Sequence, residues 1–183
     1  MLDWLKKSLG LAPAKRRRLG LHTLLHVRHL DKDGNVLFEH VGHNLLHDEG
    51  EELFCNYLTG KTAIPANLYL GLDTRVAVAE DDALTDLTTE PSGDGYARSA
   101  IVKDTGWTVQ QDSGTGDWEF VSTTETFTAS GGDWGAVTRM FLTTESSGTA
   151  GSLIATEDLS QSRTIQDGES LEATITVRLK EAA

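Results

Sequence analysis

The sequence predicts a mainly β protein: an antiparallel, jelly-roll-like β-sandwich with one short helix before the main sheet and an N-terminal extension. First, short β-patterned segments are separated by turns rich in Gly, Ser, Thr and Asp. Second, the last segment, Ser170–Lys180, alternates apolar and polar residues, as a strand does when one face of its sheet is buried. Third, 183 residues suffice for one such domain with a buried core.

The N-terminal extension, residues 1–20, has Leu2, Leu5 and Leu9 at helical spacing before Gly10. A helix of about two turns is not stable alone, so we expect it to dock on a partner. The extension holds six basic residues and one acidic residue, whereas the remainder holds ten basic and 27 acidic residues. We interpret it as an anchor that binds a partner protein; simple solvation or contact with nucleic-acid phosphates are the alternatives. The residues assigned to this arm are Leu2, Trp4, Leu5, Lys6, Lys7, Leu9, Lys15, Arg16, Arg17 and Arg18.

Residues 21–183 are expected to form the β-sandwich domain. It begins with a hairpin at 21–41, whose turn, Asp31–Asn35, includes Gly34 at positive φ. Asp31, Asp33 and Asn35 also resemble a calcium loop. However, Gly34 comes too early and the twelfth position is Gly42, so a calcium site is not predicted.

A helix is predicted at about 48–59. Its first turns hold four acidic residues, which suit the positive end of the helix dipole, and Gly60 ends it. Its apolar stripe consists of Leu53, Phe54, Tyr57 and Leu58.

After Gly60 the apolar pattern changes from helical to alternating. The strands predicted from this pattern are Asn67–Leu72, Tyr96–Lys103, Trp118–Ser122, Glu125–Ala129, Ala136–Thr143, Ser152–Thr156, Arg163–Gln166 and Ser170–Lys180.

The composition restricts the partners and the compartment. A strongly acidic body repels nucleic acid and anionic lipid, so we expect neither as a partner. No apolar run is long enough to span a bilayer, and the N-terminus lacks the pattern of a secretion signal. The single cysteine, Cys55, cannot form an internal disulfide and suits assembly in a reducing cytoplasm.

Six histidines within 26 residues raise the hypothesis of a metal site. On a strand, His22 and His26 share a face while His29 points to the other, so the spacing does not bring three ligands together. We therefore favour structural roles and predict no metal and no cofactor, with a metal-dependent enzyme kept as an alternative. The histidines are His22, His26, His29, His40, His43 and His47.

Sequence motifs for catalysis are weak. There is no Gly-x-Ser-x-Gly elbow and no phosphate-binding loop with a lysine. Cys55 is expected to be buried in the helix and inert, and Glu80–Asp82 to be solvated. We assign no catalytic residue and do not expect an enzyme.

Three tryptophans fall in the β-patterned region. Trp134 is expected in the core. Trp107 and Trp118 are left open between the core and a flat platform that binds sugars.

One stretch carries a resemblance to a known family. Pro91–Arg98 reads Pro-Ser-Gly-Asp-Gly-Tyr-Ala-Arg, after Leu68–Leu72 and before Trp134–Val137. In this order the motifs, over roughly residues 35–180, resemble a β-sandwich family of virion structural proteins, tail fibre or tail accessory proteins, of tailed bacteriophages. The residues that we assign to this structural motif are Tyr69, Gly71, Pro91, Gly93, Gly95, Tyr96, Arg98, Trp134 and Gly135.

Folding roles are expected for the motif. Gly93 and Gly95 permit a sharp turn into a strand that begins at Tyr96. The Tyr96 hydroxyl is expected to find a backbone partner, and Arg98 an acidic side chain or a loop carbonyl.

The resemblance implies a non-catalytic virion protein, assembled in the bacterial cytoplasm, that is a tail, collar or fibre-associated component. Its expected partners are other virion proteins and further copies of itself. The alternatives are a capsid decoration protein, or a carbohydrate-binding module that recognises a host surface glycan.

Overall fold

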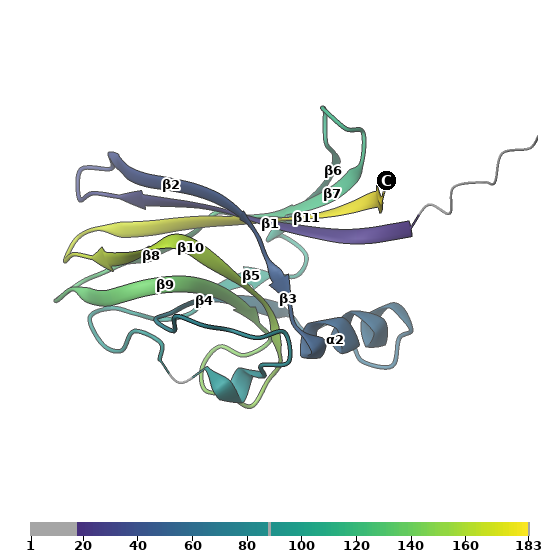
Figure 1. The fold of residues 1–183 in the computed structure, drawn as a ribbon, viewed down its shortest axis with the longest axis horizontal. Coiled ribbons are helices and arrows are strands. Elements are labelled where there is room, and N and C mark those ends of the chain that lie inside the picture. The colour runs from purple at the N-terminus through teal and green to yellow at the C-terminus, as the bar shows by residue number, and fades with distance from the viewer. Residues whose placement is uncertain (1–17, 88, 183) are drawn as a thin grey trace, which may run out of the picture.

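The computed structural model describes residues 18–87 and 89–182, which form an antiparallel β-sandwich (Figure 1). In the described residues, two sheets face each other and one α-helix, α2 (Asp48–Leu58), lies at one end. The predicted fold class, a mainly β sandwich with one short helix, is thereby confirmed. No helix in this part of the chain has the length and apolar character to cross a bilayer.

The first sheet has the strand order β2-β1-β11-β7-β6, and β8 also pairs with β11. Its centre is the pair of β1 and β11, which runs from Arg18 opposite Ala182 to Leu30 opposite Ser170. The strands are β1 (Arg18–Leu30), β2 (Val36–His43), β6 (Trp107–Gln111), β7 (Trp118–Ser122), β8 (Glu125–Thr128) and β11 (Ser170–Ala182).

The second sheet has the order β3-β10-β9-β4-β5. Its strands are β3 (Leu45–Leu46), β4 (Asn67–Asp73), β5 (Ser99–Val102), β9 (Trp134–Thr143) and β10 (Leu153–Ile165). A 3-10 turn, η1 (Leu84–Asp86), lies in the loop between β4 and β5.

The core lies between the sheets because each contributes one apolar face. Leu171, Ala173, Ile175 and Val177 of β11 are buried, whereas Leu179 near its end is 44% exposed. They pack in one cluster with residues of the second sheet, among them Leu70, Leu72, Met140 and Leu142. The alternation in the final strand therefore predicts the buried face correctly as far as Val177.

The helix packs closely on β10. Gly50 is buried, and a methyl group there would lie 2.4 Å from the carbonyl oxygen of Ile154. The Glu49 carboxylate accepts backbone hydrogen bonds from Leu84 (3.1 Å) and Leu153 (2.6 Å). One side chain thus joins α2, η1 and the second sheet.

Several strand predictions differ from the structure. The strands predicted at Ser152–Thr156 and Arg163–Gln166 are parts of one long strand, β10 (Leu153–Ile165). Its polar middle bulges, and Ser160 there has a φ of 62°, so the alternation that predicts a strand is interrupted. The strand predicted from Tyr96 begins at Ser99, since the backbone still turns at Tyr96. β6 was not predicted because it is an edge strand whose residues are mostly exposed.

Candidate functional site

Arg98 is the most heavily bonded side chain of the Pro91–Arg98 motif. Its guanidinium donates to the Glu90 carboxylate and to the carbonyls of Glu145 (2.9 Å) and Gly148 (2.8 Å). It also lies 5.0 Å from the centroid of the Phe141 ring. Both expected kinds of partner, an acidic residue and a loop carbonyl, are present. Arg98 therefore ties the loop at 145–148 to the second sheet.

Tyr96 closes the edge of the core. Its ring meets Trp134 edge to face, with centroids 5.6 Å apart. Its hydroxyl accepts from the Leu72 amide (2.9 Å), the expected backbone partner, and donates to Glu90 (2.8 Å). Burial raises the pKa of Tyr96 far above its usual value, so the hydroxyl stays protonated and serves as a donor.

The other motif residues lie in the turn before Tyr96 and on the strands β4 and β9. Trp134 is buried and its indole donates to the Asp94 carbonyl (3.0 Å), so the expectation that it belongs to the core is correct. Gly93 and Gly95 have φ of 74° and 79°, as the turn before Tyr96 requires. Gly71 lies under Phe141. The remaining three are Tyr69, half-buried on β4; Pro91, half-buried beside Tyr96; and Gly135, exposed on β9 with open space beside it.

The histidines are distributed rather than gathered. His22 and His43 are exposed, His26 pairs with Glu39 (2.6 Å), and His40 lies 3.6 Å from Glu157. In the described part of the chain, no group of three His, Cys, Asp or Glu side chains is placed to hold a metal ion.

Two histidines are buried and hydrogen-bonded. His29 Nδ1 accepts from Arg163 (3.2 Å), so Nε2 carries the proton and donates to Glu169 (2.9 Å). His47 contacts Thr156 (3.0 Å) and the Glu80 carbonyl (3.1 Å) at the start of α2. Burial lowers the pKa of both imidazoles, although their acidic or carbonyl partners oppose it. Both therefore stabilise the fold in the neutral form.

The other candidates for chemistry lie apart. Cys55 is exposed on α2, so the expectation of a buried thiol is wrong: the helix turns its buried side, with Leu53 and Phe54, toward the sheets. Glu80 and Asp81 are exposed, as expected for a solvated loop. Asp82 instead pairs with Arg75 (3.3 Å). Gly34 has a φ of 83° in the hairpin turn, as expected.

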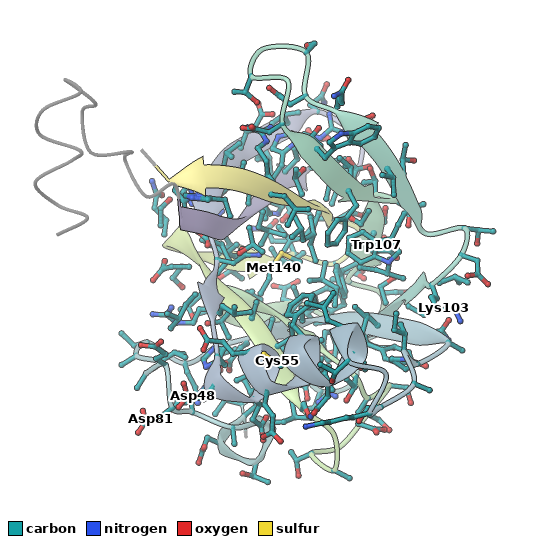
Figure 2. All side chains as sticks on the ribbon, turned by 90° about the vertical axis from the view of Figure 1, so that its right-hand side faces the viewer. Asp48, Cys55, Asp81, Lys103, Trp107 and Met140 are labelled. Atoms are coloured by element: carbon teal, nitrogen blue, oxygen red, sulfur yellow. The ribbon has the colours of Figure 1, made fainter. Side chains whose placement is uncertain are left out.

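A groove of about 280 Å³ opens at the end of the sandwich that carries α2. Figure 2 looks onto this end, with Trp107 above the helix that carries Cys55. Leu53, Phe54 and Tyr57 of α2 form one wall, and Trp107 and Phe120 of the β6–β7 hairpin form another. The rest of the lining is Ile64, Pro65, Leu68, Lys103, Val109, Leu142, Ile154 and Val177, so the groove is almost entirely apolar.

The hairpin continues this apolar surface outward. Val109 pairs with Phe120, and residues two apart on a strand share a face, so Trp107, Val109, Phe120 and Trp118 face the same way. Trp107 is half-buried against Phe120, with ring centroids 5.4 Å apart. Trp118 is 55% exposed and Val109 70%. The sequence left both tryptophans open between the core and a surface platform. In the structure, Trp107 lines the groove and Trp118 lies on the surface.

The predicted anchor arm lies mostly outside the described residues. This holds for Leu2, Trp4, Leu5, Lys6, Lys7, Leu9, Lys15, Arg16 and Arg17. Arg18 is the first residue of β1 and pairs with Ala182, so the sheet begins inside the predicted extension of residues 1–20.

Sequence reasoning missed the partners that make the motif work. No role was assigned to Glu90, which joins Tyr96 and Arg98, or to Phe141, which lies between Gly71 and Arg98. Glu90 directly precedes Pro91, but Asp94 is closer to Arg98 along the chain, so the sequence alone does not select Glu90 as the partner. Phe141 is 43 residues away from Arg98 along the chain, and no local sequence pattern identifies it as a partner.

One comparison with known proteins gives a match. The model of a family described as "Podophage GP4 fiber I protein gp80" matches residues 46–177. The match includes α2, the motif, the groove and nearly all of the second sheet. No curated protein matches the chain.

Proposed function

Since the chain belongs to the family of the podophage GP4 fiber I protein gp80, and is therefore a structural fibre protein of a bacteriophage virion, we propose that it attaches to the particle through its N-terminal arm. The family match begins at residue 46, so the arm lies outside the part that the family shares. A segment outside the shared part is suited to a contact with a particular neighbour.

The pattern of the arm supports this attachment. The spacing of Leu2, Leu5 and Leu9 predicts an apolar stripe that a short helix cannot bury by itself. Its basic residues suit an acidic protein surface. The partners are other virion structural proteins, and further copies of this chain are expected in the same assembly.

A non-catalytic role is part of the proposal. The polar groups that chemistry would need are engaged within the fold: Arg98 and Tyr96 with Glu90, and His29 with Arg163 and Glu169. Each of these contacts connects separate loops or strands. These contacts give Arg98, Tyr96 and His29 structural roles, in which they stabilise a rigid body that binds partners.

Removal of residues 1–17 tests the attachment. The cut spares β1, whose pairing with β11 begins at Arg18. The truncated chain is expected to fold with an unchanged circular dichroism spectrum and to be missing from purified particles. Normal incorporation of the truncated chain would overturn the attachment role.

Two full-length variants separate the parts of the arm. Replacing Leu2, Leu5 and Leu9 by Ser removes the apolar stripe, and replacing Lys15, Arg16 and Arg17 by Ser removes the basic run. We expect the first variant to lose incorporation and the second to reduce it in a salt-dependent way, because surface charge is screened by salt.

Recognition of a host glycan is a second candidate, favoured by the exposed Trp118. Its indole, 55% exposed beside Val109, offers a flat apolar surface of the kind on which sugar rings stack. Calorimetric titration with host surface polysaccharide tests it, with Trp118→Ala as the variant and Val76→Ala, at an exposed residue outside this surface, as the control. Equal heats for the wild type and Trp118→Ala would rule out this role for Trp118.

A further inference from the structure

The groove between α2 and the β6–β7 hairpin has the character of a docking surface. Its lining is almost entirely apolar, yet Ile64 and Val109 are 53% and 70% exposed, and Trp118 extends the same surface. Contiguous exposed apolar surface on a soluble protein commonly marks an interaction site. The groove lies between one helix and two strands, a shape that accepts an amphipathic helix.

The sequence of the chain predicts such a helix near its N-terminus. The pattern of residues 2–9 predicts a helical segment with Leu2, Leu5 and Leu9 on one face. Eight residues in a helix are about 12 Å long, so this is a short apolar rod that needs a surface to be stable.

The segment can reach the groove of its own chain. Arg18, where the described residues begin, is five positions along β1 from Thr23, which pairs with the groove residue Val177. Five strand residues span about 17 Å. Residues 10–17 can extend to about 27 Å, so they cover this distance with slack. Figure 1 shows the start of β1 at the same end of the sandwich as α2.

Charge favours the same contact. Residues 1–17 hold five basic residues and one acidic residue, whereas residues 18–183 hold 11 basic and 27 acidic residues. The basic segment is therefore attracted to the body from which it leaves. A short tether also gives the segment an effective concentration in the millimolar range at its own groove.

We infer that, in the unattached subunit, residues 2–9 dock in the groove of their own chain, with Leu2, Leu5 and Leu9 against α2 and the β6–β7 hairpin. This goes beyond the attachment role, because it concerns the subunit before assembly. The apolar stripe and the groove then cover each other until a partner on the particle takes the arm.

Cross-linking of the full-length chain tests the docking. In a Cys55→Ser background, Ser8→Cys keeps the apolar face of the segment, and Ile64→Cys places a second thiol at the groove. A short bismaleimide reagent at low protein concentration is expected to give a cross-linked monomer. The control pair, Ser8→Cys with Lys32→Cys, has its second thiol in the turn beyond Leu30, at the far end of β1, and is expected to give little product.

Each product has a defined meaning. A cross-linked dimer would show that the segment of a second copy occupies the groove and would overturn docking in the same chain. A yield no higher than that of the control pair would overturn the inference as well.

A second measurement avoids thiol chemistry. In the full-length chain, Leu5→Asp with Leu9→Asp is expected to shift the methyl resonances of Ile64 and Val109. Lys7→Asp makes the same change of charge, by two units, on the opposite face of the segment and should leave them unchanged. Unchanged resonances in the first variant would contradict the docking, even if loss of the arm still prevents incorporation.

Discussion

The ring of Phe141 fills the space that a side chain at position 71 would need. Gly71 and Phe141 pair across β4 and β9, and a methyl group on Gly71 would lie 2.3 Å from Cζ of the ring. The ring also contacts the guanidinium of Arg98, which lies 5.0 Å from its centroid. Gly71, Phe141 and Arg98 thus form a stack that begins in the sheet and ends in the motif.

Gly71→Ala is expected to destabilise the fold by about 2 kcal/mol, because the Phe141 ring must move in a packed core. Gly135→Ala is the matched control, since this glycine is also on a strand of the second sheet but has open space beside it. Urea unfolding of both variants measures the difference. Equal free energies of unfolding for the two variants would show that Phe141 adapts without cost.

Arg98→Met is expected to lower the free energy of unfolding by about 3 kcal/mol, since Glu90 and two loop carbonyls lose their donor. Arg98→Lys should recover only part of this loss, because an ammonium cannot reproduce the planar guanidinium contacts. Arg28→Met is the control: Arg28 pairs with Glu172 at the surface and should contribute at most about 1 kcal/mol. Thermal unfolding followed by circular dichroism compares the three.

Glu157 makes stability depend on pH. Burial, with a smaller effect of Asp158, raises the pKa of this carboxyl from 4.5 to about 7, whereas Arg139 lowers it. His40 Nε2 lies 3.6 Å from the Oε1 atom of Glu157. Between pH 4.5 and about 7 the folded state binds more protons at Glu157 than the unfolded state does. The contribution of Glu157 to stability is therefore fully present below pH 4.5 and is lost as the pH rises through about 7.

Glu157→Gln should therefore stabilise the protein at pH 8, by on the order of 3 kcal/mol, and have little effect near pH 4.5. Glu52→Gln, at an exposed carboxylate on α2, is the control for the loss of one surface carboxylate. Urea titrations across this pH range give the comparison. A Glu157→Gln effect that is constant with pH would contradict the raised pKa.

Glu49→Ala is expected to cost about 2 kcal/mol, because the amides of Leu84 and Leu153 lose their acceptor. Hydrogen exchange at these two amides should accelerate. Glu52→Ala, on the exposed side of the same helix, should leave both rates unchanged. Protection retained at both amides in Glu49→Ala would show that another acceptor replaces the carboxylate.

The sequence predicts those features that depend on neighbouring residues. The alternation in Ser170–Lys180 identifies the buried face of β11 because strand geometry has a period of two residues. The Gly34 turn and the start of the helix near Asp48 are likewise local. The motif indicates the Tyr96 and Arg98 contacts, since both find a partner, Glu90, within eight residues.

Other features depend on contacts between distant parts of the chain. The groove combines α2, three strands of the first sheet and parts of the second, and no single segment encodes that meeting. The exposure of Cys55 follows from which side of α2 faces β10, which Gly50 decides by its close contact with Ile154. The length of β10 was not predicted, because polar residues at its bulge interrupt the alternating pattern.

The long ladder between β1 and β11 has a mechanical consequence. Each of the two strands is 13 residues long, and Arg18, at the root of the arm, belongs to its first pair. Suppose the arm is held and the far end of the sandwich is pulled along the strand axis. The load then runs parallel to the strands and is shared by the whole ladder, which must slip as a unit rather than open pair by pair.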